Sequence, residues 1–378
     1  MSTRRVVVVG AGAIGASVAY RLAQAGTAVT VVEKAMPGGG ASSTSFAWVG
    51  ASAAALRRYH DLNAAGVQGY RRLQLEMDGA RWYRHTGCLT WYSDPHRGPE
   101  VSERIGELRA AGYPAAALSP AAVLRDLEPD VRIAAGVEHV AYYPDEGYVA
   151  VVPMIRHLLD EARRHGARLM TGHAVVGMGL AGNRVTGVQL ADGTSMEADR
   201  VVVCCGRHTG AVAALAGAHV PLLDPAVPGS PAVGLLARTR PLFVRLSTLI
   251  YADELMMRPD GDGRLLVHSD TLDAVVAAGG ADHLAVAEQL VGMVATHLVG
   301  AEDVRLEAQQ IGLRALPEDL LPAVGWTPEV DGLYVVVSHS GITLAPVLGD
   351  LVAVEVAGGA DQPLLADFRP TRFGPLAP

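Results

Sequence analysis

The sequence predicts an α/β fold built on a parallel sheet that begins with a βαβ unit. Three observations support this fold class: the four consecutive valines 6–9, the pattern G-x-G-x-x-G directly after them, and Glu33 at the end of the next apolar stretch. Four β-branched residues in a row are typical of a strand buried on both faces, and the glycines form the turn into a helix. A glycine pattern alone arises by chance, so the prediction depends on the flanking strand, helix and acid.

This turn has the chemistry of a dinucleotide site. Gly10 permits the tight turn, Gly12 lets the backbone approach a pyrophosphate, and Gly15 lets helix and strand pack closely. The helix N-terminus offers backbone N–H groups to the anion in the stretch that includes Ala11, Ala13 and Ile14. We expect Glu33 to accept hydrogen bonds from two ribose hydroxyls of an adenosine, which argues against a 2′-phosphate. A purely structural turn with an unrelated Glu33 is the alternative.

A second glycine-rich segment follows the acid. Gly38-Gly39-Gly40 precedes a run of hydroxyl residues that includes Ser42 and Ser43. Three glycines let the backbone come close to a ligand, and serine hydroxyls can donate to phosphate. We therefore expect this segment to hold more of the cofactor, with a flexible linker as the alternative.

Composition excludes several function classes. The 378 residues carry a formal net charge of −8 with no dense Lys/Arg run, so nucleic acid is an unexpected partner. No signal-peptide pattern and no bilayer-spanning stretch is recognisable, so we expect a cytoplasmic protein with no membrane association. Three cysteines make no disulfide framework, and the histidines show no zinc spacing, so we expect no metal.

The placement of the apolar strands favours FAD over NAD. Strands of the dinucleotide type are expected at 6–9, 29–33, 201–205 and 333–337, whereas a nicotinamide dehydrogenase usually completes this fold in the first half of the chain. Helices are expected over 52–78, with its apolar face in the core, over 281–299, and over 344–356, and Asp192-Gly193 indicates a hairpin.

The sequence resembles the FAD-dependent D-amino-acid oxidase superfamily, in the branch of glycine oxidase, sarcosine oxidase and related amine oxidases and dehydrogenases. The matching motifs run nearly end to end, and the distinctive ones are GLRALPEDLLPAVG at 312–325 and HSGITLAPVLGD at 339–350. The resemblance implies a Rossmann-like, discontinuous FAD-binding domain of the glutathione-reductase type and a β-sheet-rich α+β substrate domain. The FAD-binding domain would comprise 1–47, 148–221 and 309–378, and the substrate domain 48–147 and 222–308.

The resemblance also implies a set of cofactor residues. Glu33 would bind the ribose with Lys34 nearby, Ser42 and Ser43 would meet the pyrophosphate, and Val175 would touch the adenine. Residues 46–48 would pass beside the isoalloxazine, and 339–343 would run under its pyrimidine end, where a helix N-terminus near Thr343 stabilises negative charge on reduction. The residues assigned to FAD are Gly10, Ala11, Gly12, Ala13, Ile14, Gly15, Glu33, Lys34, Ser42, Ser43, Phe46, Ala47, Trp48, Val175, Cys205, Gly206, Gly312, His339, Ser340, Gly341, Ile342 and Thr343.

Arg314 falls where relatives hold the substrate carboxylate. A guanidinium matches a carboxylate in a bidentate pair, and a buried one should find an anion. The alternative is a structural ion pair with a nearby Glu or Asp.

The sequence departs from the family at three places. Met256 stands where glycine-oxidase-like members have Tyr, and Tyr251 is a possible substitute. His268 stands where many relatives have Gly; a His there would steer a polar substrate or supply positive charge, or it is an ordinary core or surface residue. No lysine follows Lys34, which weakens the case for an oxidase, because sarcosine-oxidase relatives use one to activate oxygen. No residue stands in a covalent-flavin context, so the FAD should be non-covalent.

The predicted reaction is oxidation of an amino acid or N-substituted glycine by hydride transfer from the α C–H to flavin N5, giving an imine that water hydrolyses. The acceptor is O2, giving H2O2, or a non-oxygen acceptor; an NAD-dependent dehydrogenase and a non-catalytic flavoprotein subunit are the rivals. The predicted catalytic residues are Arg314, Tyr251 and His268. The predicted substrate-binding residues are Trp48, Tyr251, Met256, His268, Arg314 and His339.

Overall fold

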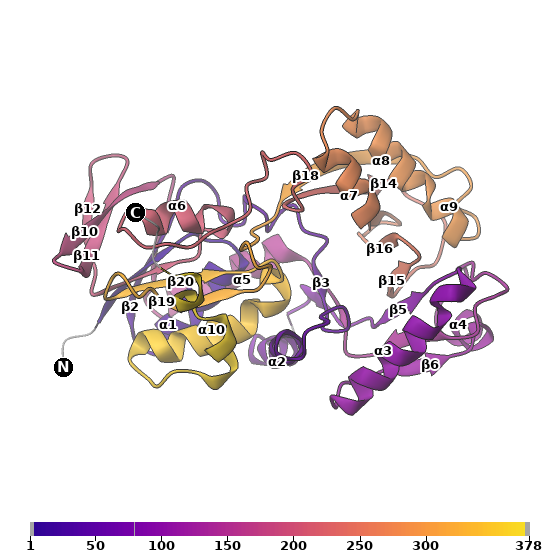
Figure 1. Ribbon diagram of the computed structural model, residues 1–378, viewed down its shortest axis with the longest axis horizontal. Helices are drawn as coiled ribbons and strands as arrows, with labels where there is room; N and C mark the ends of the chain where they lie inside the picture. Colours follow the sequence, from indigo (N-terminus) through magenta and orange to yellow (C-terminus); the bar gives the residue numbers. More distant parts are fainter. Residues whose placement is uncertain (1–3, 79, 375–378) are drawn as a thin grey trace.

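The computed structural model describes residues 4–78 and 80–374. The chain forms two parts, each organised around its own large sheet, with the N- and C-termini in the same part (Figure 1). Segments from the beginning, middle and end of the chain share the first sheet, which is the discontinuous arrangement that the dispersed apolar strands predict.

The first sheet has six strands. They are parallel, except that the strand at one edge runs antiparallel to its neighbour. The four strands of the dinucleotide type, far apart in the sequence, are neighbours in it. In order across the sheet the strands are β19 (Ala323–Trp326), β20 (Leu333–Val337), β13 (Arg200–Val203), β1 (Arg5–Val9), β2 (Ala28–Glu33) and β9 (Arg168–Thr171).

Both faces of this sheet are buried, and successive side chains of its central strand β1 point to opposite faces. Val6 and Val8 pack into the core that includes the helices of one face, whereas Val7 and Val9 belong to a separate core on the other face. This double burial is why the valine run forms a central strand. The helices of the first face are α1 (Ala13–Gln24), α5 (Val151–Arg164) and α10 (Gly341–Ala357); the second is covered by α6 (Thr209–Ala214), β10 (Val175–Ala181), β11 (Arg184–Leu190) and β12 (Ser195–Glu197).

The second sheet has eight strands and is antiparallel apart from the parallel pair β15 and β5. It is the β-rich part expected for substrate binding. In order across the sheet its strands are β18 (Leu306–Leu313), β14 (Val233–Thr239), β17 (Leu265–His268), β16 (Leu255–Pro259), β15 (Leu249–Ala252), β5 (Cys88–Trp91), β7 (Val140–Tyr143) and β6 (Ala116–Leu118).

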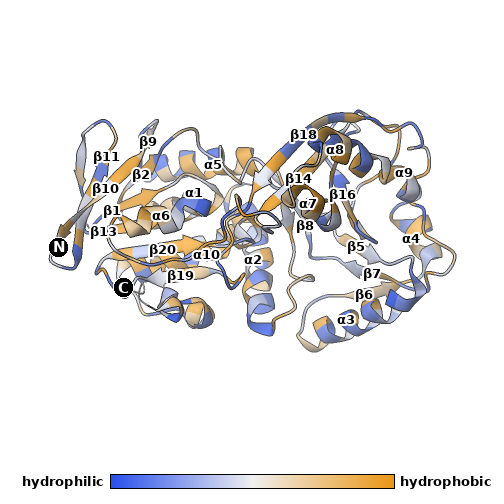
Figure 2. Ribbon diagram, turned by 45° about the horizontal axis from the view of Figure 1, so that its top comes forward, coloured by the Kyte–Doolittle hydropathy of each residue, from blue (hydrophilic) through white to orange (hydrophobic). Residues whose placement is uncertain are grey.

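The two faces of this sheet have different neighbours. One face packs on an apolar core with α7 (Asp270–Ala277), α8 (His283–Gly292) and α9 (Val294–His297) (Figure 2). On the other face, directly opposed residues of four adjacent strands form a row: Leu236, His268, Met256 and Tyr251. Because opposed residues in a ladder point to the same face, this row is shared by one side of the sheet.

Shorter elements connect the two parts. Helix α2 (Arg57–Glu76) packs along α10, and a small sheet carries the chain between the domains. The strands of that sheet are β3 (Trp48–Val49), β8 (Gly147–Val149) and β4 (Tyr83–Arg84). The remaining elements are α3 (Gly98–Ala110), α4 (Pro120–Asp126), and the short helices η1 (Pro95–Arg97), η2 (Gly206–His208), η3 (Pro363–Phe368) and η4 (Pro370–Phe373).

Several boundaries differ from the sequence expectation. The helix expected over 52–78 covers only 57–76, and Leu75, expected in its core face, is 81% exposed. The helix expected over 281–299 is two helices, α8 and α9, and the last long helix begins at Gly341 rather than near Thr343. The hairpin at Asp192-Gly193 is confirmed, with β11 and β12 antiparallel. No helix among the described residues has the length and apolarity to cross a membrane.

Candidate active site

A cavity of about 770 Å³ lies between the two sheets and is lined by segments from both. Its first end is formed by the turn after β1, the segment 38–48, the loop after β13 and the start of α10. Its second end is formed by residues of β14, β16, β17 and β18. One continuous site therefore joins the predicted cofactor residues to the predicted substrate residues.

The glycine turn leaves no room for side chains. Gly10 has φ +101°, and a Cβ added there would lie 2.5 Å from the carbonyl oxygen of Cys204. A Cβ at Gly15 would lie 2.0 Å from the carbonyl oxygen of Gly10, whereas one at Gly12 meets only the hydroxyl of Ser42, at 3.2 Å. Gly10 and Gly15 are thus required by packing, and Gly12 keeps a surface open toward the cavity.

The start of α1 has the donor set for a phosphate. The backbone N–H of Ala13 donates to the hydroxyl oxygen of Ser42, 3.2 Å away, so Ser42 supplies an acceptor where a phosphate oxygen would fit. Ser43 lies elsewhere: its hydroxyl donates to the carbonyl of Gly40 (3.0 Å), and it is not among the lining residues. The residues present fit a pyrophosphate, and the contact expected from Ser43 stays a prediction.

Glu33 ends β2 at the cavity wall. Its carboxylate accepts from the backbone N–H groups of Ala11 and Ala35, both at 2.9 Å, which fixes it beside the glycine turn. Its neighbour Lys34 donates to Nε2 of His208, 3.0 Å away, and both also line the cavity. This end therefore offers the carboxylate of Glu33 and the ammonium of Lys34 next to it, a chemistry that fits an adenosine ribose next to a phosphate.

The segment 46–48 crosses the middle of the cavity in a fixed conformation. Ala47 has φ +62°, a strained value for a residue with a Cβ. The indole N–H of Trp48 donates to the carboxylate of Glu146 (2.9 Å), and the guanidinium of Arg258 donates through Nε to the carbonyl of Phe46 (2.7 Å). Both partners are buried, and burial raises the pKa of Glu146. Side chains from two other segments thus hold this strained stretch in place.

The start of α10 closes the cavity from below the glycine turn. The hydroxyl of Tyr59 donates to that of Ser340 (2.7 Å), and the hydroxyl of Thr343 donates to the carbonyl of Trp48 (3.0 Å). The hydroxyl oxygen of Ser338, which is 5% exposed, has no hydrogen-bond partner among the described residues. An unpaired buried hydroxyl on the wall of a cavity is the kind of group that a bound ligand satisfies.

At the second end, Arg314 is held by protein groups. One terminal nitrogen donates to the carbonyls of Pro231 (3.0 Å) and Val233 (2.9 Å), and the other forms an ion pair with Asp273. The alternative left open by the sequence, a structural ion pair, is therefore present. Arg314 nevertheless lines the cavity and remains 22% exposed.

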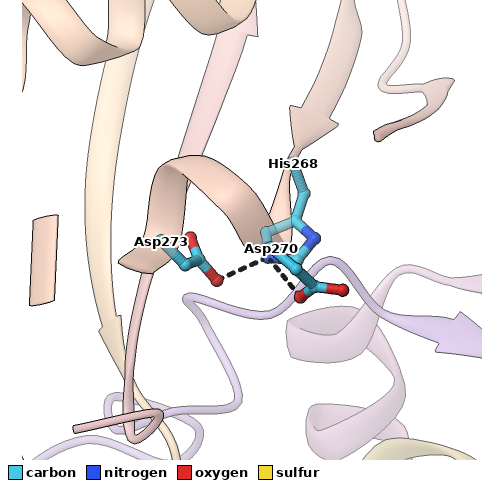
Figure 3. Close-up of side chains that lie close together, drawn as sticks. All are labelled: His268, Asp270 and Asp273. Atoms are coloured by element: carbon cyan, nitrogen blue, oxygen red, sulfur yellow. Dashed lines mark hydrogen bonds and ion pairs between the residues drawn. The ribbon is translucent and has the colours of Figure 1, made fainter. Parts of the chain in front are cut away.

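His268 completes this charged cluster. Its Nε2 lies 2.7 Å from the carboxylate of Asp273, and its Nδ1 is buried with no partner among the described residues (Figure 3). The hydrogen bond from His268 and the charge of Arg314 lower the pKa of Asp273, although burial alone would raise it. His268, Asp270 and Asp273 place ligand atoms within 4.8 Å of one another, but the guanidinium of Arg314 already neutralises Asp273.

His339 projects into the same end from the loop before α10. The enclosing protein atoms, and next the positive charge of Arg314, lower its pKa to about 4. His339 is therefore a neutral hydrogen-bonding group at ordinary pH.

Most of the predicted site residues meet at this cavity. Those that line it are Gly10, Gly12, Ala13, Ile14, Glu33, Lys34, Ser42, Phe46, Ala47, Trp48, Cys205, Gly206, Met256, His268, Gly312, Arg314, His339, Ser340, Gly341, Ile342 and Thr343. Ala11, Gly15 and Val175 lie outside the lining. Ala11 and Gly15 support the glycine turn, whereas Val175 begins β10 and pairs with Leu190.

Tyr251 is also outside the lining. It shares the sheet face of Met256, as expected, but it lies one strand farther from His268, and its ring packs edge-to-face on Tyr92 with centroids 6.4 Å apart. Residue spacing does not determine the register of this hairpin, so it could not decide between Tyr251 and Met256. In this structure Met256 lines the cavity and Tyr251 does not, and the expected replacement of the family Tyr by Tyr251 stays a prediction.

Other lining residues escaped the sequence analysis. Tyr59 and Asn63 were expected to lie on a core helix but face the cavity from α2. Asp270 and His208 also line it, and Asp273 sets the charge of Arg314. The signal for His208 was its place directly after the Cys205-Gly206 strand end; Asp270 and Asp273 follow His268 but fit no motif.

Comparison with known proteins agrees with this architecture. The uncharacterized oxidoreductase YurR of Bacillus subtilis is 27% identical over 96% of this chain and 98% of its own length. Glycine oxidase of Geobacillus kaustophilus is 28% identical over 97% and 96%. The crystal structure of glycine oxidase from Geobacillus kaustophilus superimposes with a TM-score of 0.82 at 24% identity, covering 98% of this chain and 99% of that one. The family model for FAD dependent oxidoreductases matches residues 5–354, so the chain belongs to this FAD-dependent oxidoreductase family.

Proposed function

We propose that this protein binds FAD non-covalently and oxidises the C–N bond of an amino acid or an N-substituted glycine. The observation that carries the proposal is the single cavity in which the glycine turn and Arg314 lie at opposite ends. The name glycine oxidase, printed for both the similar sequence and the similar structure from Geobacillus kaustophilus, supports an amino acid as the substrate class. The residues of 1–47, 148–221 and 309–378 would hold the cofactor, and the remainder would form the substrate domain.

Bound FAD supplies the acceptor for a hydride leaving the carbon next to the nitrogen. The glycine turn, Ser42 and Glu33 would hold its pyrophosphate and ribose. Residues 46–48 and the start of α10 would enclose its ring system, and the partial positive charge of the α10 N-terminus favours negative charge there.

The protein's own part in the reaction is to place the substrate. Arg314 would bind a substrate carboxylate while still paired with Asp273, and Met256 and Trp48 would form the apolar wall beside the reacting carbon. The substrate loses a hydride from carbon and a proton from nitrogen, which leaves an imine, and water converts the imine to an oxo acid and an amine. Two electrons then pass to O2, giving H2O2, or to another acceptor.

The test is an anaerobic titration of the purified protein with D-amino acids, glycine, sarcosine and longer N-substituted glycines, followed through flavin absorbance. Bleaching by one class supports the proposal, and admitting air separates oxidase from dehydrogenase. A yellow protein that no amine bleaches would favour a non-catalytic subunit, a reading that Met256 at the family Tyr position supports. A colourless protein would overturn the proposal.

A further inference from the structure

The carboxylate of Asp270 faces the substrate end of the cavity. Asp270 is the first residue of α7, lines the cavity, and has a side chain that is 70% exposed, with Oδ1 3.8 Å from Nε2 of His268. Burial raises the pKa of Tyr251 and the charge of Asp270 adds to this effect, whereas burial lowers the pKa of His339 and the charge of Asp270 opposes it. The charge of Asp270 therefore acts on residues of three separate segments.

The neighbouring charges are already paired. Arg314 forms its ion pair with Asp273, and Arg97, which lies over the ring of Tyr92, forms one with Glu100 at 3.0 Å. In the described part of the chain, His268 is the only basic residue within ion-pair distance of Asp270. Among the described residues, Asp270 is therefore an acid at the substrate end that no arginine pairs with.

Neither histidine is a close cationic partner for Asp270. Nε2 of His268 lies 2.7 Å from the carboxylate of Asp273, whereas Oδ1 of Asp270 is 3.8 Å away. His339 has a pKa of about 4 because of its enclosure, so it is uncharged at neutral pH.

A helix dipole alone does not account for Asp270. Acids are favoured in the first turn of a helix, but Asp273 already places a carboxylate in that turn of α7, and Ser269 caps it through Leu272. An exposed carboxylate on a cavity wall remains ionised because it stays hydrated. It attracts a cation toward the cavity and binds it once the cation is inside.

We propose that the substrate carries a second cationic group, which Asp270 binds, so that the preferred substrate is a basic amino acid or a diamine. This inference rests on the proposed amine oxidation. The reacting nitrogen must be neutral to lose hydride from its neighbouring carbon, whereas the second group stays protonated on Asp270. Asp270 is thus a specificity-determining residue rather than a catalytic one.

A matched pair of substrates tests this. Lysine and norleucine differ by the side-chain ammonium, and 1,4-diaminobutane and butylamine differ in the same way without a carboxylate. We expect the FAD-loaded protein to be reduced anaerobically at least tenfold more efficiently by the dicationic member of a pair, with D270N removing most of the preference and D270E keeping it. If the protein prefers lysine over norleucine but does not distinguish the two amines without a carboxylate, the substrate is a basic amino acid. D303N, an exposed acid far from the cavity, is the control.

Ligand binding separates this inference from the proposed reaction. Benzamidine and benzoate have similar shapes and opposite charges, and their binding is followed as a shift of the flavin spectrum without turnover. We expect D270N to weaken benzamidine binding about tenfold and to leave benzoate binding unchanged or stronger. Equal benzamidine affinity in D270N and the parent would overturn the inference even if an amine bleaches the flavin. A lost benzamidine preference in a protein that no amine bleaches would instead support Asp270 and count against the proposed reaction.

Discussion

Arg314 and Asp273 form an ion pair on the wall of the cavity, and the same carboxylate accepts hydrogen bonds from His268 (2.7 Å) and from the backbone N–H of Leu235 (2.6 Å). Asp273 is 4% exposed, so this pair is shielded from water and its charges act strongly on each other. A substrate carboxylate must share Arg314 with an acid that is already in place.

Replacing Arg314 tests its role as a carboxylate anchor. Arg314→Ala should raise the apparent KM for a carboxylate substrate by orders of magnitude while the flavin stays bound, because the glycine turn, Ser42 and Glu33 lie at the other end of the cavity. Arg314→Lys keeps the charge but loses the planar guanidinium, so its KM should lie between those of the parent protein and Arg314→Ala. Steady-state kinetics with flavin content measured in parallel give the answer, and an unchanged KM in Arg314→Ala would refute the anchoring role.

Asp273→Asn should strengthen the binding of benzoate several-fold. The amide still offers an oxygen to Leu235 but no longer neutralises Arg314, so the guanidinium gains affinity for an outside anion. Benzoate titration of the flavin spectrum measures the effect. Weaker benzoate binding in a variant of normal melting temperature would show that Asp273 orients Arg314 more than it competes for it.

Substitutions at two glycines of the turn after β1 should affect folding and FAD binding separately. Gly15→Ala places a Cβ 2.0 Å from the carbonyl of Gly10, so the protein should fail to fold or lose more than about 3 kcal/mol of unfolding free energy. Gly12→Ala meets only a serine hydroxyl at 3.2 Å, so it should fold and lose FAD affinity by at least about tenfold.

The control for the glycine turn is Gly106→Ala. Gly106 lies inside α3 with nothing within 4 Å of an added Cβ, so this change should be neutral or stabilising by up to about 1 kcal/mol. Thermal melts and FAD titration of the three variants are the measurements. A Gly12→Ala protein with full FAD affinity would show that the backbone does not approach the pyrophosphate at this residue.

Glu33→Arg should weaken FAD retention. The substitution removes the acceptor that ends β2 and places a second cation beside Lys34 and His208. Dialysis followed by the ratio of flavin to protein absorbance measures retention, and Glu33→Gln, which keeps an acceptor, should lie between the variant and the parent. A fully loaded Glu33→Arg protein would show that Glu33 does not contact the ribose.

His339 predicts a stability change with pH. Its pKa is about 4 in the folded protein against 6.5 in the unfolded chain, mainly because of burial. Between pH 6.5 and 4 the imidazole of His339 is protonated in the unfolded chain but not in the folded protein. The free energy of unfolding should therefore decrease as the pH falls through this range. His339→Asn cannot titrate, and its denaturant midpoint should fall less between pH 7 and 5; equal falls in the two proteins would contradict the pKa of His339.

The sequence predicted the cofactor end better than the substrate end, for a physical reason. A strand buried on both faces, a turn that only glycine fits, and an acid at the next strand end are local patterns, so the βαβ unit follows from residues 6–33 alone. Arg314 was placed by its motif, but its ion pair with Asp273 depends on how β18 meets α7, which no local pattern encodes. Tyr251 and Met256 lie directly opposite each other on the neighbouring strands β15 and β16. The hairpin turn at Asp253 sets this pairing, and residue spacing alone does not reveal it.

The cavity joins the turn after β1 to the start of α10, and β13 lies between β1 and β20 in the sheet. Because residues 338–343 are synthesised long after residues 10–14, a growing chain carries an incomplete cofactor site through most of its translation. Until β20 has emerged, β13 is left as an open sheet edge, and no flavin can be enclosed. A chain terminated at residue 337 would keep every glycine of the first turn and still be colourless.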